Sequence, residues 1–446
     1  MTVPGVRDLV EAEDHARRRL VSALVSGDPL PAEPARPGRA VVAGVALGVI
    51  TLAVGLLLDA LSGGAGPAWP ERGLVVSRDD GSAYVVLGDA GVHPVTDGTS
   101  ARLLLGGEVA PVLLDQSRID AHDPGERIGI AGAPAAVPSA DRLVEATWSA
   151  CAPGQTAVTV GIGGPATPEP SGRADAVLVR SGQDLAVVTA DDGGEARAYP
   201  LPGGPGDDNL LLALGLPPRT AAVVVPRRWL ALPPPGGTLS AASFLITGVG
   251  DRPVYAGDAL PGSARVGDWF PAAGGARLLT SSGPSVLTPF ALAVWRTAAT
   301  QDPGGPVELG VAAPPALPLV GVPYAAAGWP AELRQSLTGS PCVLLSADGV
   351  RLGSVEAPPG EDPVVVEPGR GSLVRAAGQD GGQEGDRVLL VADDGRAYPV
   401  VGTDALDALG YAEVTPVTVP PAWLRLLERG PVLSVEAALT APAGDR

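Results

Sequence analysis

Hydrophobic residues run without interruption from Ala40 to Leu58, where nineteen consecutive positions carry no charge. An α-helix of that length rises about 28 Å, which is enough to cross the hydrocarbon core of a bilayer. A signal peptide is the alternative, because the small residues Ser62 to Gly66 offer a possible cleavage site. Its apolar region would be shorter and closer to the N-terminus, so the pattern favours an uncleaved transmembrane helix.

An amphipathic helix is predicted within the segment that precedes this span. Apolar residues recur at three to four residue spacing through residues 6–25, and Gly27 to Pro29 end the pattern. Two uses of the helix remain open, since it could rest on the membrane surface or dock to a partner protein. In either case the contacting residues would be Arg17, Arg18, Arg19, Leu20 and Leu24.

Beyond the span, the hydrophobic pattern changes to short runs rich in β-branched residues. Examples are LVVS at 74–77, AYVVL at 83–87, LAVVTA at 185–190 and VLLVA at 388–392. The 61 Gly and 48 Pro of the chain separate such runs, as turns do. We therefore predict an α+β, mostly β, ectodomain with more than one core.

Two stretches of this ectodomain repeat the same order of elements. From Leu185 the chain contains LAVVTADDGGEARAYPLP, ALGL and VVVPRRWLALPP, and from Val388 it contains VLLVADDGRAYPVV, ALGY and VTVPPAWLRLLERGP. A diverged copy begins with LVVSRDDGSAYVVL at Leu74, and a weaker one with GARLLTSSGPSVLTPFALAVW at Gly275. The pattern predicts four small units of strand, turn, strand and helix.

Two tryptophans, Trp229 and Trp423, occupy the same place in the two clearest copies. A tryptophan that recurs at the same position in two copies most simply packs the helix of each unit onto its own sheet. The alternative is that both rings are exposed and bind sugar or a neighbouring subunit.

Charge distribution suggests which side of the membrane each segment occupies. Six Arg and six Asp or Glu precede Ala40, and positive charge beside a membrane helix favours the cytoplasm. We therefore predict a cytoplasmic arm and an extracytoplasmic C-terminal domain. Because the arm is neutral, the net charge of −18 belongs to the exported domain, and an acidic surface argues against nucleic acid as a partner.

Cys151 and Cys342 are the two cysteines of the chain, and both lie beyond the predicted membrane helix, where disulfides persist. We expect them to be bonded to each other, and two unpaired buried thiols are the alternative. A catalytic thiol is less expected, because no His lies near either cysteine in the sequence.

Residues with catalytic or metal-binding chemistry are sparse. His15, His93 and His122 are too scattered to have the spacing of metal ligands. The Asp-Asp-Gly runs lack the alternating ligands of a calcium loop and predict hairpin turns. The chain has no lysine, so it lacks a P-loop, and it has no G-x-S-x-G elbow. We predict no catalytic residue, no metal and no cofactor.

Several motifs, taken in order, resemble those of the EccB family, a core membrane component of the actinobacterial type VII (ESX) secretion machinery. They are RRRLVSALVSGDP before the membrane helix, LVVSRDDGSAYVV, HPV, SARLLLG, RIGIAGAP at 127–134, LVEATWSAC at 143–151 and GSPCVLLSADG at 339–349. The resemblance covers nearly the whole chain. The arm departs from the family pattern because it carries no aromatic residue.

The resemblance implies an elongated exported region with a central domain of antiparallel strands. Four repeat units, similar to cell-wall-binding modules, would surround it about a pseudo-twofold axis, and a disulfide would join Cys151 to Cys342. It also implies an inner-membrane protein that forms homo-oligomers and assembles with EccC, EccD, EccE and, outside the membrane, the mycosin protease. Family members are sometimes described as ATPases.

We divide the chain accordingly, into a cytoplasmic arm (1–39), a transmembrane helix (40–58), a linker (59–72), repeat unit one (73–130), the first central-domain segment (131–174), repeat unit two (175–242), repeat unit three with central-domain strands (243–315), the second central-domain segment (316–370) and repeat unit four (371–440). The predicted function is a structural subunit of the secretion complex. The alternatives are a peptidoglycan-binding membrane anchor and a membrane-anchored hydrolase, including an ATPase.

Overall fold

The computed structural model describes residues 68–442, with gaps at 108–109, 146, 164–167, 169, 256–259, 274, 299–307, 309–316, 318, 323–327, 357–362 and 378–387. The chain separates into two compact units, residues 1–69 and residues 70–446. The predicted arm and membrane helices, with Arg17, Arg18, Arg19, Leu20 and Leu24, lie outside the described residues. None of the helices in the described region is long and apolar enough to span a bilayer.

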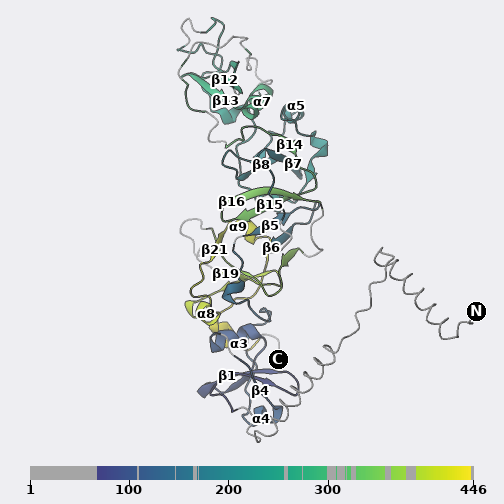
Figure 1. The fold of residues 1–446 in the computed structure, drawn as a ribbon, viewed down its shortest axis with the longest axis vertical. Helices are drawn as coiled ribbons and strands as arrows, with labels where there is room; N and C mark the ends of the chain where they lie inside the picture. The colour runs from purple at the N-terminus through teal and green to yellow at the C-terminus, as the bar shows by residue number, and fades with distance from the viewer. Residues whose placement is uncertain are drawn as a thin grey trace, which may run out of the picture. The chain divides into compact units, whose positions relative to one another are not determined.

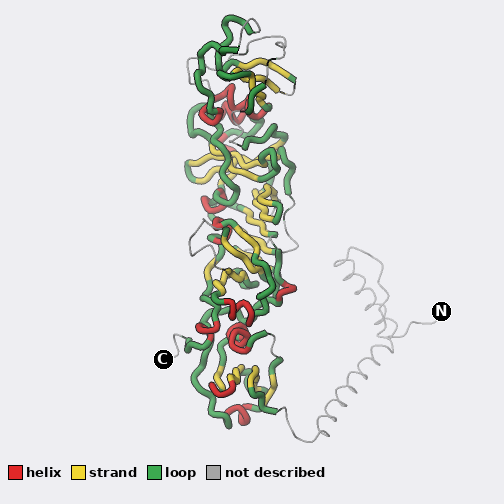
Figure 2. The backbone as a smooth tube through the Cα atoms, turned by 90° about the vertical axis from the view of Figure 1, so that its left-hand side faces the viewer, coloured by secondary structure: helices red, strands yellow, loops and turns green. Residues whose placement is uncertain are grey.

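The described residues form five sheets with short helices between them, which confirms a mostly β domain (Figures 1 and 2). Three groups of elements share one arrangement. The first module comprises β1 (Arg72–Ser77), β2 (Ala83–Leu87), β3 (Val92–Pro94), α3 (Gly98–Leu105), β4 (Val112–Leu114) and α4 (Gln116–Asp120). The second module comprises β7 (Asp175–Ser181), β8 (Asp184–Ala190), β9 (Ala196–Pro200), α5 (Asp207–Ala213), β10 (Val223–Val224) and α6 (Arg227–Leu230). The last module comprises β18 (Ser372–Ala376), β19 (Val388–Val391), β20 (Arg396–Val400), α8 (Thr403–Ala408), β21 (Val417–Val419) and α9 (Pro421–Leu424).

Within each module, three consecutive strands pair antiparallel, a helix follows, and the next strand pairs in parallel with the first. Tight turns make the antiparallel pairs possible, and Gly81, with φ of 76°, supplies the left-handed backbone in the first of them. Asp97 begins α3 because its side chain accepts a hydrogen bond from the N–H of Ser100.

The Asp-Asp-Gly turns do not occupy the same place in the three modules, which corrects our alignment of the copy at Leu74. In the first module the turn joins strands one and two, whereas in the second and last modules it joins strands two and three. Either connection is a tight hairpin that favours Asp and Gly, so the same motif arises at two different turns.

One feature does occupy the same place in all three modules, namely a His or Tyr side chain on the third strand. In each module the ring packs on a glycine, where a Cβ atom would overlap it, and the pairs are His93 with Gly125, Tyr199 with Gly236, and Tyr398 with Gly430. The three glycine N–H groups donate to the carbonyl oxygens of Val92, Ala198 and Ala397, at 2.8, 2.7 and 3.0 Å.

A central five-stranded sheet has the order β16-β15-β5-β6-β17. Its strands are β5 (Trp148–Cys151), β6 (Thr159–Ile162), β15 (Ser340–Ser346), β16 (Gly349–Val355) and β17 (Val364–Val366). The first four pair antiparallel as expected, but β17 is parallel to β6. The reason is that the chain crosses from β16 at one edge to β17 at the opposite edge instead of turning back.

The fifth sheet contains β11 (Trp269–Ala272), β12 (Gly275–Leu279) and β13 (Pro284–Leu287), which pair antiparallel and lead into α7 (Pro289–Ala298). We expected residues 243–315 to add strands to the central sheet, but the strands described in this range pair only with one another. The other short elements are η1 (Gly88–Ala90), η2 (Ala140–Arg142), η3 (Arg219–Ala221), η4 (Ala241–Phe244), β14 (Gln335–Ser336), β22 (Glu428–Arg429) and α10 (Val435–Ala438).

Three hydrophobic cores connect the sheets in series. One joins the first and last modules, a second joins the last module, the central sheet and the second module, and a third joins the second module to β11–β13 and α7. Sequence order and spatial order therefore differ, because the first module packs on the last one.

The N-terminal half of the described chain contains the first and second modules, and the C-terminal half contains the last module. These two halves also exchange segments. The segment before β5 lies on the last module, where the N–H of Val144 donates to the Gly371 carbonyl at 2.7 Å. The segment before β15 lies on the second module, where the N–H of Leu337 donates to the Ala176 carbonyl at 2.7 Å. Each half thus completes a module of the other half.

Candidate functional site

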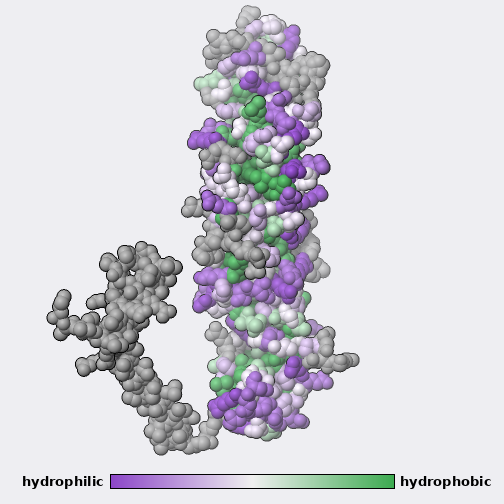
Figure 3. All heavy atoms as spheres, turned by 90° about the vertical axis from the view of Figure 1, so that its right-hand side faces the viewer, coloured by the Kyte–Doolittle hydropathy of each residue, from purple (hydrophilic) through white to green (hydrophobic). Residues whose placement is uncertain are grey.

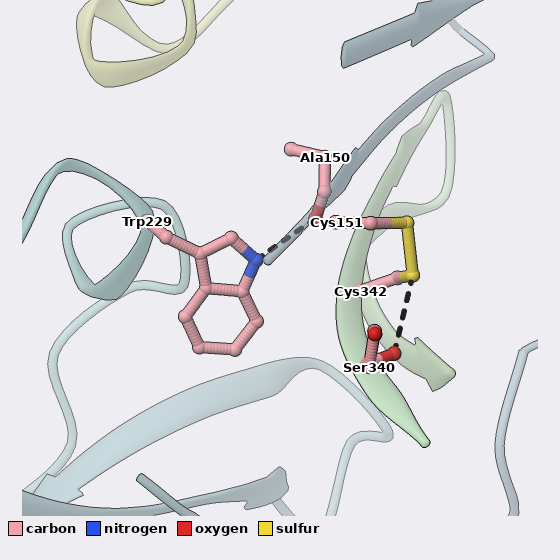
Figure 4. Close-up of a disulfide and its surroundings, with 5 residues drawn as sticks. All are labelled: Ala150, Cys151, Trp229, Ser340 and Cys342. Carbon is pink, nitrogen blue, oxygen red and sulfur yellow. Dashed lines mark hydrogen bonds between the residues drawn. A yellow bond between two sulfur atoms is a disulfide. The ribbon is translucent and has the colours of Figure 1, made fainter. Parts of the chain in front are cut away.

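The two cysteines form a disulfide at the centre of the central sheet, as predicted (Figure 4). Cys151 on β5 lies directly opposite Cys342 on β15, with their Cα atoms 4.0 Å apart. The N–H of Ala152 donates to the Pro341 carbonyl at 2.9 Å, so the cysteines form a non-hydrogen-bonded pair, the pairing in which opposite side chains approach most closely. The bridge spans 191 residues and fixes the register between the two halves.

The disulfide is buried on one face of the sheet, and tryptophans pack on the other. Cys151 and Cys342 are 3% and 0% exposed and share a small cluster with Leu344. Residues on β5 alternate in direction, so Trp148 belongs to the large central core instead. The face with the disulfide is covered less completely, because Arg351 and Val365 lie on it and are exposed.

Trp229 and Trp423 are both fully buried, which confirms their role in packing. The ring of Trp229 also reaches beyond its own module, because its Nε1–H donates to the Ala150 carbonyl of β5 at 2.9 Å (Figure 4). Trp423 meets Trp148 edge to face, with ring centroids 6.4 Å apart. Both rings thus join a module to the central sheet, and neither is available to stack on a sugar.

One carboxylate of each Asp-Asp-Gly turn acts within its own hairpin, whereas Asp79 and Asp393 accept hydrogen bonds from the more distant N–H groups of Gln116 and Gly369, both at 2.8 Å. Asp80, Asp191 and Asp394 accept hydrogen bonds from the N–H groups of Ser82, Glu195 and Arg396, at 2.9, 3.0 and 3.0 Å. The hydrogen bond from the Ser82 N–H is the main cause that lowers the pKa of Asp80 below its usual value. These contacts confirm the prediction of hairpin turns.

The described histidines are used locally. His93 has its Nδ1 2.9 Å from the Glu126 carbonyl oxygen, and His122 has its Nδ1 2.9 Å from the carbonyl oxygen of Arg118. Among the residues that the structure describes, no three His, Cys, Asp or Glu side chains are grouped as metal ligands would be.

Arg102 is a residue that sequence reasoning missed. It extends from the last turn of α3, and its Nη2 donates to the carbonyl oxygen of Leu409 at 2.7 Å, just where α8 ends. The N–H of Gly107 donates to the adjacent Ala408 carbonyl at 2.9 Å. These contacts satisfy carbonyls that a helix end leaves free, and they join the first module to the last. The only sequence signal was the position of Arg102 in the SARLLLG motif.

Comparison with known proteins places these features in one family. The family model described as "Type VII secretion system ESX-1, transport TM domain B" matches residues 4–339 and 334–444. The "ESX-5 secretion system ATPase EccB5" of Mycobacterium tuberculosis is 26% identical over 458 residues, which cover 90% of this chain and 87% of the relative. The "ESX-1 secretion system ATPase EccB1" of Mycolicibacterium smegmatis is 33% identical over 150 residues, which cover 33% of this chain and 29% of the relative.

Solved structures have the same fold. A chain in the "intact ESX-5 inner membrane complex" has a TM-score of 0.62 and 23% identity, with 99% of this chain and 96% of that chain covered. The "EccB3 dimer from the ESX-3 core complex" gives a TM-score of 0.61 and 22% identity, with 83% of this chain and 100% of that chain covered.

Proposed function

Since this chain belongs to the EccB family and is a structural subunit of the type VII secretion membrane complex, we propose that its exported domain is a rigid scaffold that joins other subunits. The observation that carries this proposal is the pair of interlocked halves around one disulfide-bridged sheet. A domain built this way resists deformation, because separating the halves requires breaking the bridge and both exchanged segments. The partners implied are EccC, EccD, EccE, the mycosin protease and further copies of the chain.

We further propose that the domain consists of four repeat units arranged about a pseudo-twofold axis near the disulfide. The three modules with a common order of elements support this division, and the fourth unit would be β11–β13 with α7. The boundaries given from the sequence serve as the working division.

Exposed apolar side chains support a role in assembly. Leu245, Val249 and Val254 are 72%, 51% and 91% exposed, and apolar residues lie among polar ones on the face seen in Figure 3. Such strongly exposed apolar side chains within one short stretch of sequence are candidates for contact with another subunit.

Purification tests the assembly. The chain would be extracted from the membrane with a C-terminal tag in mild detergent, and the proteins that accompany it would be identified by mass spectrometry. We expect the other core subunits to be recovered. Replacing Val254 with Asp should reduce their recovery, whereas the same change at Leu113, which is 49% exposed on β4, serves as the matched control. Recovery of the chain alone would contradict the proposal.

The membrane topology is proposed from the sequence, with the arm in the cytoplasm and one span at Ala40–Leu58. Protease added to spheroplasts should digest the domain after Asp59 and leave the arm intact. A protected C-terminus would show that the orientation is wrong. Arg17, Arg18, Arg19, Leu20 and Leu24 remain the proposed contacts of the arm with lipid or a partner.

The relatives' names carry the word ATPase, and we propose that this chain contributes no ATP hydrolysis of its own. The support is its lack of lysine, which removes the P-loop contact to the β and γ phosphates. Purified chain, free of other subunits, should release no phosphate from ATP above a buffer control.

A further inference from the structure

A pocket lies beside α3, close to the contact between the first and last modules. Its volume is about 450 Å³, and the described residues that line it are Leu74, Gly98, Ala101, Arg102, Leu105, Gly107 and Ala110. Four of these follow the i, i+3, i+4, i+7 spacing and therefore share one face of α3. The volume is within the range of sites that bind small molecules.

Arg102 gives the pocket one positive charge. One guanidinium nitrogen, Nη2, donates to the Leu409 carbonyl, and the Nε is buried, so the terminal nitrogens are the ones that could meet a ligand. No ion pair found among the described residues includes Arg102. Among the described residues the charge meets a neutral carbonyl and no carboxylate, so the guanidinium favours an anionic ligand.

The rest of the described lining is glycine, alanine and leucine. Sugars and bases are commonly held by stacking on aromatic rings, which this portion of the wall does not offer. A single arginine matches a single carboxylate, and the aliphatic wall matches a small alkyl side chain. We propose that the pocket binds the free carboxylate end of a short aliphatic peptide, with Arg102 as the carboxylate-binding residue.

Two sources share this chemistry, the C-terminus of a protein with L-residues and a cell-wall peptide with D-residues. The probes are therefore acetyl-L-Ala-L-Ala and acetyl-D-Ala-D-Ala, each compared with its neutral amide. Binding to the full-length chain in detergent would be measured by ligand-observed NMR. At least one free acid should bind saturably, its amide should bind about tenfold more weakly, and the preferred stereochemistry identifies the source.

Three variants assign the site. Arg102→Gln should weaken binding of the acid about tenfold. Arg72→Gln is the matched control, because Arg72 also donates to a backbone carbonyl, that of Leu104 at 2.6 Å, but does not line the pocket. Ala110→Trp, at an exposed position, should block binding while it leaves Arg102 in place.

Thermal melts establish whether each variant is folded. If Arg102→Gln does not fold, Ala110→Trp alone tests whether the ligand binds in this pocket. The proposal is overturned if the unmodified chain binds neither acid saturably. It is also overturned if binding survives in every folded variant of Arg102 and Ala110.

Discussion

Single side chains in this protein do their work by joining segments that are distant in sequence. Trp229 donates to the central sheet 79 residues away, and Tyr411 donates to the Pro138 carbonyl 273 residues away. The recurrence of the tryptophans at one place in two copies predicted that they are packing residues, and their burial confirms it. It did not show their partners, since a carbonyl acceptor carries no sequence signal.

The two module tryptophans allow a matched test of the indole hydrogen bond. Trp229→Phe removes a buried hydrogen bond and leaves the Ala150 carbonyl without that donor, whereas the Nε1–H of Trp423 has no acceptor among the described residues. The loss of ring volume is the same in both variants. We expect Trp229→Phe to lower the free energy of unfolding by about 1–2 kcal/mol more than Trp423→Phe does, as measured by urea denaturation. Equal effects would mean that packing alone accounts for both residues.

The glycines beneath the tyrosine rings give a second prediction. A Cβ atom at Gly430 would overlap the Tyr398 ring, so Gly430→Ala should cost about 1–3 kcal/mol in stability, and Gly236→Ala should cost a similar amount through Tyr199. Gly154→Ala is the control, because open space surrounds that position. In a double-mutant cycle, Tyr398→Ala should remove much of the penalty of Gly430→Ala. Additive effects would show that the ring is not the cause.

At the scale of elements, local pattern predicted strands and turns but not which strands pair. The runs LVVS, AYVVL and LAVVTA are all strands. The Asp-Asp-Gly turn suggested the wrong equivalence for the first module, because turn chemistry reports a tight hairpin and not its number in the sheet. Likewise, the valine run of β17 fits a parallel or an antiparallel edge equally well, and only the crossover decides between them.

The disulfide links strands β5 and β15, and its removal tests how much the stability of the central sheet depends on it. Closing a loop of 191 residues contributes at most about 5 kcal/mol in the chain-entropy model. The double variant Cys151→Ala with Cys342→Ala should therefore be less stable by a few kcal/mol and should migrate more slowly than the oxidised protein on a non-reducing gel. Fast migration that persists in the variant would show that the bridge does not set the compactness of the denatured chain.

The whole molecule is held together by exchange between its halves, and this could not be predicted from the sequence. The repeats predicted similar units, but a repeat pattern carries no information on which unit packs on which. The first module packs on the last through α3, and the segments before β5 and β15 complete modules of the opposite half. Long-range contacts of this kind depend on side-chain packing among all five sheets, which periodicity along one segment does not encode.

Two buried tyrosines donate hydrogen bonds to the segments that the halves exchange. These contacts should make the assembly of the halves sensitive to alkaline pH. Tyr199 donates to the Gly328 carbonyl at 2.5 Å and Tyr411 to the Pro138 carbonyl at 2.6 Å, and burial raises the pKa of both hydroxyls far above the ordinary value. Because the folded pKa is raised, the stabilisation is complete below the unfolded value of about 10 and is lost as the pH rises beyond it. Melting temperature should therefore fall steeply above about pH 10, and less steeply in Tyr199→Phe and Tyr411→Phe, which have no proton to lose.

Tyr84→Phe controls for the loss of a hydroxyl elsewhere, because the Tyr84 hydroxyl accepts a hydrogen bond from Gln116 at 3.1 Å. If all three variants keep the slope of the unmodified protein, the alkaline transition arises elsewhere and the two tyrosines do not govern the contact between the halves.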